Sequence, residues 1–407
     1  MEAKNLRERN TQLLLSIVWE AREISRVDLA RRSGLARSTV SVIVQELLRR
    51  DLVRTSHLAK SRGGRPPIVL RFNDDRYRIL GVDLGASHAT VCSVNLRGRV
   101  LAEETRAFDV QGDPDGALDL VVDLVERVTA ATPEPQDLIG VGLGVPSPLD
   151  SAHPENLSER ILPQWRGRRP RVELEARLGT PVFMDNDANL GALAEHQWAR
   201  GASVPSLAYI KVSTGVGSGL ILDGRVFSGA TGIAGEIGHT AIDASGPPCR
   251  CGLSGCLEAM VGAGSLTRRL SELTGEDASN LGPEDIARAA REGDPRCTQV
   301  VQEAGRYLGI AIANLVNLVN PAEVVLGGSL TDAGDLLLDP LHEAVRERAL
   351  FASVEQAQVR VGTLGHRAVA LGAATQVLQS FLADPSAVGS PPSSTGRVDV
   401  SSAAAIA

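Results

Sequence analysis

The chain has 407 residues, of which 43% are apolar and 22% charged, and its formal net charge is −7. A globular protein of this length can form two or three domains. No run approaches the roughly 20 apolar residues that a membrane span needs, and the opening sequence MEAKNLRERN lacks the apolar core of a signal peptide. These properties exclude the membrane-spanning class and predict a cytoplasmic protein.

The charge is distributed unevenly along the chain. Residues 1–71 contain fifteen Lys or Arg and seven Asp or Glu, a net charge of +8, so the remaining 336 residues carry −15. Such a division predicts a basic module that binds a polyanion, joined to an acidic body.

The basic module begins with a predicted amphipathic helix over residues 5–22. Its apolar side chains recur at helical spacing on one stripe, which consists of Leu6, Leu13, Leu14, Ile17 and Val18. The following sequence, SRVDLARRSGLARSTVSVIVQELLRRDLV, predicts a helix, a tight turn and a second helix. Ser25 is expected to cap the first helix, Gly34 to permit the turn, and Arg37 or Ser38 to begin the second helix.

The second of these helices has the pattern of a DNA recognition helix. Its apolar residues Val40, Ile43, Val44 and Leu47 share the inward face, whereas small and polar side chains share the outward face. Side chains of this kind can approach base edges closely. The residues expected to contact DNA on this helix are Arg37, Ser38, Thr39, Ser41 and Gln45. A plain three-helix bundle with a solvated face is the alternative, and the basic excess favours DNA binding.

A hairpin-like stretch runs from residue 53 to the sequence VLRF and predicts the wing of a winged helix-turn-helix domain over residues 1–73. The wing contains GGRPP, in which glycines allow close approach and prolines hold an extended backbone. Arg65 in this stretch could therefore enter an A·T-rich minor groove. The same composition would also suit a stiff interdomain linker, and both interpretations remain open.

From Tyr77 the sequence changes to strands punctuated by glycine. RILGVDLG, ATVCSVNL and VLAEET predict strands of one antiparallel sheet, followed by a helix over residues 115–130 and a buried strand, LIGVGLGV. A similar order of strand, glycine turn, strand and Gly-Arg turn recurs in LAYIKVSTGVGSGLILDGRVF. This weak repeat predicts two α/β lobes over residues 77–382, each with a glycine-rich turn at a shared cleft. The Ser/Pro/Gly-rich residues 384–407 predict a disordered tail.

Polar residues cluster after the predicted short strand PVFM. In the sequence MDNDAN, the Asp187 carboxylate could accept a proton from a sugar hydroxyl, and the Asn186 amide could hold that hydroxyl. The same residues would also suit a helix N-cap with an Asx turn, and this alternative remains open. Glu236, His239 and Glu258 are further groups able to bind a polyol, although each alone is also typical of a solvated surface.

Three of the five cysteines lie in the eight-residue sequence CRCGLSGC, at positions 249, 251 and 256. In a reducing compartment, clustered cysteines are more often metal ligands than disulfides, and an odd total of cysteines agrees with this. Cys92 and Cys297 stand alone and are expected to be isolated thiols. The cluster therefore predicts a metal site.

Five motifs carry a family resemblance. In chain order they are MDNDAN, STGVGSG, ATGIAGEIGH, CRCGLSGCLE and VNPAEVVLGGSL, and together they resemble the ROK family of sugar kinases and sugar-responsive repressors. With a winged helix-turn-helix in front, the chain is similar to the transcriptional-regulator branch over residues 8–380. The resemblance implies a two-lobed actin/hexokinase-like (ribonuclease H-like) fold and a sugar or sugar-phosphate effector in the cleft. It also implies a homodimer or homotetramer on palindromic operator DNA, with repression of sugar uptake or catabolism genes as the expected function.

The resemblance and the ligand chemistry together point to zinc. His239 with Cys249, Cys251 and Cys256 makes the Cys₃His set of a closed tetrahedral site, and three buried thiols are the alternative. A closed site implies a structural zinc, one per chain, that connects the GEIGH segment to the loop before Glu258. The second ring nitrogen of His239 would then remain available to a sugar hydroxyl.

The two phosphate turns separate a sensor from an enzyme. Kinases of this family resemble D-x-G-G-T-K at the first turn, whereas this chain has DLGASH. The second turn has Ser213 where the kinases tend to have glycine. The residues that remain of the phosphate loops are Asp83, Gly85, Ser87, Thr214, Gly215 and Gly217. We therefore expect Asp187, at the general-base position, to be vestigial, with an active sugar kinase that also binds DNA as the alternative. The sugar's identity and the choice between repressor and activator stay open.

Overall fold

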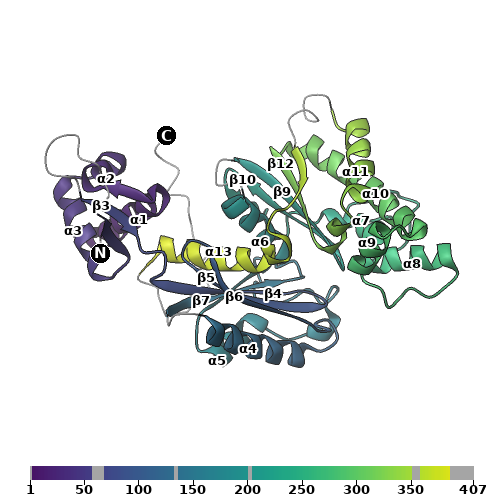
Figure 1. Cartoon of the computed structure of the whole chain (residues 1–407), viewed down its shortest axis with the longest axis horizontal. Coiled ribbons are helices and arrows are strands. Elements are labelled where there is room, and N and C mark those ends of the chain that lie inside the picture. The colour runs from purple at the N-terminus through teal and green to yellow at the C-terminus, as the bar shows by residue number, and fades with distance from the viewer. Residues whose placement is uncertain (1, 57–67, 133–135, 200–203, 351–357, 386–407) are drawn as a thin grey trace.

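The computed structural model describes residues 2–56, 68–132, 136–199, 204–350 and 358–385. They form a winged helix-turn-helix and two α/β lobes, connected by a long C-terminal helix (Figure 1). Within these ranges, no helix has the length and apolarity needed to cross a membrane. Most of the tail predicted from residue 384, and the wing residue Arg65, lie outside the described residues.

The winged helix-turn-helix has the predicted local signals. Its elements are α1 (Glu2–Ala21), β1 (Glu23–Ser25), α2 (Arg26–Ser33), α3 (Arg37–Arg49), β2 (Val53–Ser56) and β3 (Val69–Phe72). Ser25 caps α2 by accepting a hydrogen bond from the Asp28 amide at 3.1 Å, and Gly34 ends it with a φ of 69°. The strands form an antiparallel sheet in the order β1-β3-β2. This sheet confirms the hairpin predicted between residue 53 and VLRF.

The helix faces agree with the prediction in α3 and differ from it in α1. The predicted inward residues of α3 are all buried. In α1, however, Leu6 and Leu13 are exposed, and Leu15 is buried beside Leu14 and Val18. The C-terminal half of α1 packs against α2 and α3 and also against β3 and α13 (Ala368–Ala383). The buried face of α1 is therefore wider than a single stripe. It does not extend to the N-terminal turns of the helix, where Leu6 is exposed.

The first lobe is a five-stranded mixed sheet with helices on both faces. The elements of its chain segment are β4 (Tyr77–Leu84), β5 (His88–Asn95), β6 (Val100–Ala107), α4 (Pro114–Ala131), β7 (Asp137–Val145), the short η1 (Pro163–Trp165), α5 (Pro170–Leu178) and β8 (Val182–Asn186). The strand order is β6-β5-β4-β7-β8, with antiparallel pairs up to β4 and parallel pairs beyond it. Figure 1 shows α4 and α5 on one face and α13 on the other.

The second lobe repeats this order of strands. Its sheet runs β11-β10-β9-β12-β13, again antiparallel up to the first strand in sequence and parallel beyond it. The strands are β9 (Ser206–Val212), β10 (Val216–Leu222), β11 (Arg225–Val226), β12 (Glu323–Gly327) and β13 (Gln358–Val361). The helices are α6 (Asp187–Ala194), the π-helical η2 (Glu195–Ala199), η3 (Ile237–His239), α7 (Leu257–Val261), α8 (Ala263–Thr274), α9 (Pro283–Arg291), α10 (Pro295–Val319), η4 (Ser329–Ala333), α11 (Asp335–Arg348) and η5 (Gly365–Arg367). The weak sequence repeat thus corresponds to two lobes of equal topology.

Helix α13 lies in backbone contact with both lobes. Alternate glycines of β7 face it, and a Cβ on Gly142 would lie only 2.0 Å from the carbonyl oxygen of Ala373. On the opposite side, a Cβ on Gly372 would lie 1.8 Å from the carbonyl oxygen of Leu190 in α6. Both positions therefore exclude any side chain, because the helix and its neighbours touch through their main chains.

The end of α13 also carries the winged helix-turn-helix. Leu378 and Phe381 belong to one apolar core with Leu14 and Leu15 of α1 and with strands of the first lobe. The rings of Phe381 and Tyr77 pack edge to face with centroids 5.7 Å apart. In Figure 1, α13 accordingly runs from the winged helix-turn-helix toward α6. The DNA-binding fold is thus docked on the first lobe by a shared core.

We expect Gly142→Ala to lower the free energy of unfolding by about 1–3 kcal/mol or more, since the new methyl group would push α13 off the sheet. Gly264→Ala in α8 is the matched control, because no atom lies within 4 Å of its Cβ position. That change should be neutral or stabilising by up to about 1 kcal/mol. Urea unfolding of both variants is the measurement, and equal stability of the two would contradict the packing described here.

Candidate functional site

A cleft lies between the two lobes, and the predicted site residues meet there. The first lobe contributes the turn between β4 and β5 and the segment that follows β7. The second lobe contributes Lys211, the turn between β9 and β10, and the segment around η3. The residues that line the cleft include Ala86, His88, Ser147, Asn186, Asp187, Lys211, Ser213, Thr214, Gly215, Gly217, Glu236, His239, Arg250 and Glu258. All five proposed sugar-contacting residues are therefore brought to one cavity.

Asn186 and Asp187 stand where β8 ends and α6 begins. The Asn186 side-chain oxygen accepts hydrogen bonds from the amides of Ala188 at 2.9 Å and Asn189 at 3.2 Å, so Asn186 is the N-cap of α6. Its amide group donates to the Ser147 carbonyl at 3.2 Å. Asn186 thus has the capping geometry that the sequence left as an alternative, while it also lines the cleft. Asp187 is buried in the first turn of α6.

Lys211 in β9 is the main residue that the sequence reasoning missed. Its ammonium group donates to Asp187 at 2.8 Å, with 13% of the lysine side chain exposed. Burial acts against the charged form, but the charges of Asp187 and Asp83 outweigh it and raise the pKa of Lys211. A signal was present, because Lys211 is one of three lysines among 42 basic Lys and Arg residues and interrupts an apolar strand. Asp187 is therefore paired with a cation of the protein itself.

The turn between β4 and β5, predicted as the first phosphate turn, is covered by the side chain of its own His88. His88 packs directly on Gly85, and its Nε2 lies 3.3 Å from the Asp83 carboxylate. Burial opposes ionisation of Asp83, but the charges of Lys211 and His88 lower its pKa overall. Asp83 is thus held as an anion between two basic groups. The Phe108 amide donates a hydrogen bond to the Ser87 carbonyl at 3.0 Å, which attaches the turn to the end of β6.

The turn between β9 and β10, predicted as the second phosphate turn, lies against Glu258. The Val216 amide donates to Glu258 at 3.1 Å, and a Cβ on Gly215 would lie 2.5 Å from the same carboxylate oxygen. Arg250 makes a bidentate ion pair with Glu258 through bonds of 2.7 and 3.1 Å. Arg250 was also missed, although its position between two predicted metal ligands indicated that it would be held near the site.

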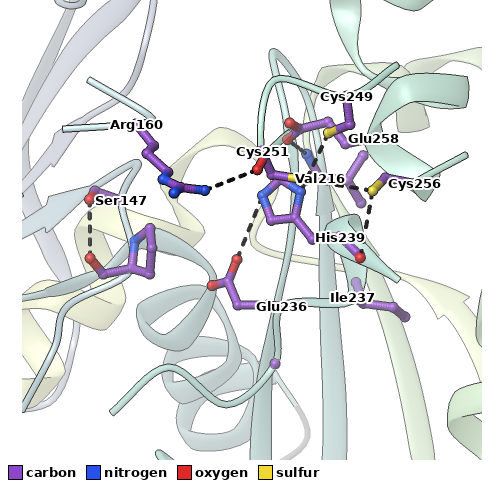
Figure 2. Close-up of polar contacts among 12 residues, drawn as sticks. Ser147, Arg160, Val216, Glu236, Ile237, His239, Cys249, Cys251, Cys256 and Glu258 are labelled. Atoms are coloured by element: carbon purple, nitrogen blue, oxygen red, sulfur yellow. Dashed lines mark hydrogen bonds and ion pairs between the residues drawn. The ribbon is translucent and has the colours of Figure 1, made fainter. Parts of the chain in front are cut away.

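Glu236 lines the cleft with a carboxyl group whose pKa is raised. Burial, and then the nearby charges of Glu258 and Asp187, raise the pKa of Glu236 to about 7. Its Oε2 lies 3.9 Å from Nε2 of His239, as Figure 2 shows. At neutral pH, Glu236 is therefore present in both protonation states and can either donate or accept a hydrogen bond.

The predicted Cys₃His cluster is assembled beside the cleft (Figure 2). One donor atom from each of His239, Cys249, Cys251 and Cys256 lies within 4.8 Å of all the others. Nδ1 of His239 is 3.6 Å from the Cys249 sulfur, and the sulfurs of Cys251 and Cys256 are 3.7 Å apart. Tetrahedral zinc with Zn–S bonds of about 2.3 Å separates its sulfurs by about 3.8 Å. The donor types and their spacing therefore fit a four-coordinate zinc ion.

Two hydrogen bonds join loops of the two lobes. The Arg160 guanidinium of the first lobe donates to the Cys251 carbonyl of the second lobe at 3.2 Å (Figure 2). The Ser151 amide donates to the Thr231 carbonyl at 2.7 Å. The loop that holds the predicted metal ligands is therefore also in contact with the opposite lobe.

The candidate DNA-contacting residues form a second, separate surface. On α3, Arg37, Ser38, Ser41 and Gln45 are exposed, and Thr39 is half-buried. The last turn of α3 is followed by Arg50, which donates to the Pro385 carbonyl just beyond α13. The exposed face of α3 thus stays free of other described elements, while its end is attached to the rest of the protein.

Comparison with known proteins agrees with this geometry. Residues 79–380 match the ROK family, and residues 7–54 match a winged helix-turn-helix DNA-binding family. The xylose repressor of Caldicellulosiruptor bescii is 32% identical over 391 residues, which cover 93% of this chain and 98% of that protein.

Two solved structures share the fold. The crystal structure of a ROK family transcriptional regulator, a homolog of the E. coli MLC protein, has a TM-score of 0.76 at 28% identity and covers 93% of this chain and 97% of its own. A ROK family glucokinase from Streptomyces griseus, in complex with glucose and AMPPNP, has a TM-score of 0.63 at 28% identity. It covers 74% of this chain and 99% of its own. The predicted fold class is confirmed: the chain belongs to the ROK family and carries a winged helix-turn-helix domain in front of its two-lobed ROK domain.

Proposed function

We propose that the protein is a sugar-responsive transcriptional repressor of sugar uptake or catabolism genes. A sugar binds in the cleft between the lobes and changes the affinity of the winged helix-turn-helix for operator DNA. One observation carries this proposal: the cleft and the DNA-binding domain belong to one packed body, because α13 contacts α6 at one end and α1 at the other. The similarity to a xylose repressor over 93% of the chain supports the same function.

The charges of the cleft favour a neutral sugar over a sugar phosphate. Asp187 is paired with Lys211, and Glu258 is paired with Arg250, so neither cation is left over for an added anion. Glu236 adds a further carboxyl group whose pKa lies at about 7. A phosphate dianion would face these three carboxyl groups, whereas the hydroxyls of a neutral sugar can donate to them.

The proposed DNA contacts come from the exposed face of α3. The side chains that would contact base edges or phosphates in the major groove are those of Arg37, Ser38, Thr39, Ser41 and Gln45. Arg65 of the wing would enter the adjacent minor groove. The net charge of +8 on residues 1–71 supports binding that weakens steeply with salt. We further propose that a homodimer or homotetramer binds two half-sites of a palindromic operator.

The proposed metal is one structural zinc ion per chain, held by His239, Cys249, Cys251 and Cys256. When bound, zinc would supply a fixed junction between the GEIGH segment and the loop before Glu258. Nδ1 of His239 faces the sulfurs, so Nε2 remains directed toward Glu236 and the cleft. The zinc ligands would thus orient two of the proposed sugar contacts, His239 and Glu258.

A sugar kinase remains the second candidate function. The turn from Thr214 to Gly217 is retained, and the similarity to a glucokinase at 28% identity supports it. Against it, Asp187 at the general-base position already accepts a hydrogen bond from the Lys211 ammonium at 2.8 Å, so one of its two oxygens is occupied. His88 folds onto the first phosphate turn instead of extending toward a nucleotide. We therefore propose that the cleft is a sensor.

The first test measures operator affinity with and without each of D-xylose, D-glucose, N-acetyl-D-glucosamine and glucose 6-phosphate. At least one sugar should change the wild-type affinity by about 5- to 150-fold, the usual range of allosteric coupling. Asp187→Asn should bind that sugar at least about tenfold more weakly in calorimetry, because a charge-assisted hydrogen bond is lost. Asp339→Asn, on the exposed face of α11, is the control. An unaltered sugar affinity in Asp187→Asn would remove Asp187 from the site.

The second test concerns the metal. Protein purified without chelators should contain one zinc per chain, and Cys251→Ser should lose both the zinc and the sugar response while retaining operator binding. Cys297→Ser changes a buried cysteine outside the cluster and should keep the zinc. Elemental analysis provides the measurement. A wild-type protein free of zinc, or a Cys251→Ser variant with full zinc content, would contradict the proposed site.

The third test concerns catalysis. With magnesium, ATP and the sugar that binds, ADP release should stay at background in wild type and in Asp187→Ala alike, since the base is paired and the phosphate turns are altered. A coupled ADP-release assay is the measurement. Turnover near about 10 per second that disappears in Asp187→Ala would establish the kinase and overturn the sensor.

A further inference from the structure

The helix that begins at the proposed sugar contacts ends in an unusual turn. Asn186 and Asp187 form the start of α6, and the helix continues into the π-helical η2, which contains Trp198. π-helical turns are rare and frequently occur at functional positions. At the start of η2, buried Glu195 accepts bonds from Arg360 at 3.2 Å and from the Leu364 amide at 3.0 Å. The second lobe therefore holds one end of η2, and Trp198 lies near the other.

Trp198 reaches from the second lobe to the first. Its indole N–H donates to the hydroxyl of Thr375 on α13 at 2.7 Å. Its ring lies on Gly98 in the turn between β5 and β6, where a Cβ would come within 2.8 Å of the ring. Gly98 also has a φ of +73°, so both space and backbone conformation reserve this position for glycine. The first lobe and α13 thus form a closely fitting contact surface for Trp198, which consists of Gly98 and Thr375.

The winged helix-turn-helix contacts Trp198 through Trp19. Trp19, in the last turn of α1, packs edge to face against Trp198 with ring centroids 6.3 Å apart and an interplanar angle of 72°. The Trp19 indole donates to the Leu96 carbonyl at 3.0 Å. Arg97 donates to the Trp19 carbonyl at 2.8 Å, and its guanidinium lies over the Trp19 ring, 4.7 Å from the centroid. Trp19 is therefore held to the first lobe by main-chain and side-chain contacts while its ring faces Trp198.

We propose that Trp198, Thr375 and Trp19 form the joint through which sugar occupancy of the cleft changes the position of the DNA-binding domain. This inference rests on the proposed function. Helix α6 packs on the sheet of the second lobe, whereas α13 packs on the sheet of the first. Helices α6 and α13 also touch each other at Leu190 and Gly372. Any rotation of the lobes around a sugar bound at Asn186 and Asp187 must therefore change the angle between α6 and α13 about this contact, and that change moves the Trp198 ring against Gly98 and Thr375.

The movement reaches DNA through α1. Trp19 belongs to the helix whose neighbouring residues Leu15 and Val18 pack in the core shared with α3. A shift of the Trp198 ring changes the support of Trp19 and hence the orientation of α1 and α3 on the first lobe. Trp198 and Thr375 act as positioning residues in this scheme, because neither lines the cleft and neither lies on the exposed face of α3.

The chain offers a matched control for this joint. Trp165, the remaining tryptophan of three, is buried in the first lobe and donates its indole N–H to the Val110 carbonyl at 2.8 Å. Trp198→Phe and Trp165→Phe therefore remove the same hydrogen bond donor at two places. Thr375→Val removes the acceptor of Trp198 with little change in volume. The probes are D-xylose, D-glucose, N-acetyl-D-glucosamine and glucose 6-phosphate, each tested on the full-length variants.

Sugar affinity from calorimetry and operator affinity without sugar should remain within about threefold of wild type in Trp198→Phe and Thr375→Val. The effect of sugar on operator affinity should fall from the roughly 5- to 150-fold of an ordinary allosteric system to less than about twofold. Trp165→Phe should retain the full effect. A structural defect alone would not separate sugar binding from its consequence at the operator.

Three outcomes overturn the joint. If Trp198→Phe and Thr375→Val respond to sugar as wild type does, the joint is absent and the proposed function stands. If Trp165→Phe loses the response equally, the loss reflects general loosening and not this contact. If wild type itself responds to none of the four sugars at the operator, the proposed function and the joint fall together. In the Trp165→Phe background the remaining tryptophans are Trp19 and Trp198, and sugar should also change the fluorescence excited selectively from them.

Discussion

The close approach of α13 to its neighbours is the constraint on which the rest of the structure depends. Between α13 and β7 there is no room for a Cβ at Gly142, and between α13 and α6 there is none at Gly372. Main chains in such contact cannot slide independently, since close-packed interiors transmit displacement instead of absorbing it. The same helix ends in the core of the winged helix-turn-helix through Leu378 and Phe381. The two lobes and the winged helix-turn-helix are thereby coupled through α13, and the lobes can turn only about its close contacts.

Charge pairing gives the cleft its chemical character. A buried lysine and a buried carboxylate are each costly alone, and the hydrogen bond of 2.8 Å between Lys211 and Asp187 offsets part of that cost. The pair occupies one oxygen of Asp187 and leaves the other able to accept a hydrogen bond from a hydroxyl group. Arg250 does the same for Glu258 from within the cysteine-rich loop. In the proposed sensor, these paired carboxylates would accept hydrogen bonds from the hydroxyl groups of a sugar.

Local signals made much of this predictable. Ser25 and Gly34 mark the ends of α2 through their own backbone chemistry, and the spacing of Cys249, Cys251 and Cys256 indicates a metal loop without any tertiary information. The α1 stripe was partly wrong because burial of Leu15 depends on β3 and α13, which are distant in sequence. Lys211 and Trp198 escaped notice for the same reason. Their partners, Asp187 and Thr375, become neighbours only after the lobes have assembled.

Hydrogen exchange of the wild-type protein tests the central claim most directly. It is measured without sugar and with a saturating concentration of a sugar that the protein binds. If the cleft and the DNA-binding domain form one coupled body, sugar should change amide protection in the sugar-contacting segments, in α6 and η2, and also in α1 at the far end of α13. Operator DNA should alter protection at α6 in return, because coupling between two binding sites is reciprocal. Changes confined to the cleft, with α1 exchanging identically in both states, would contradict the account.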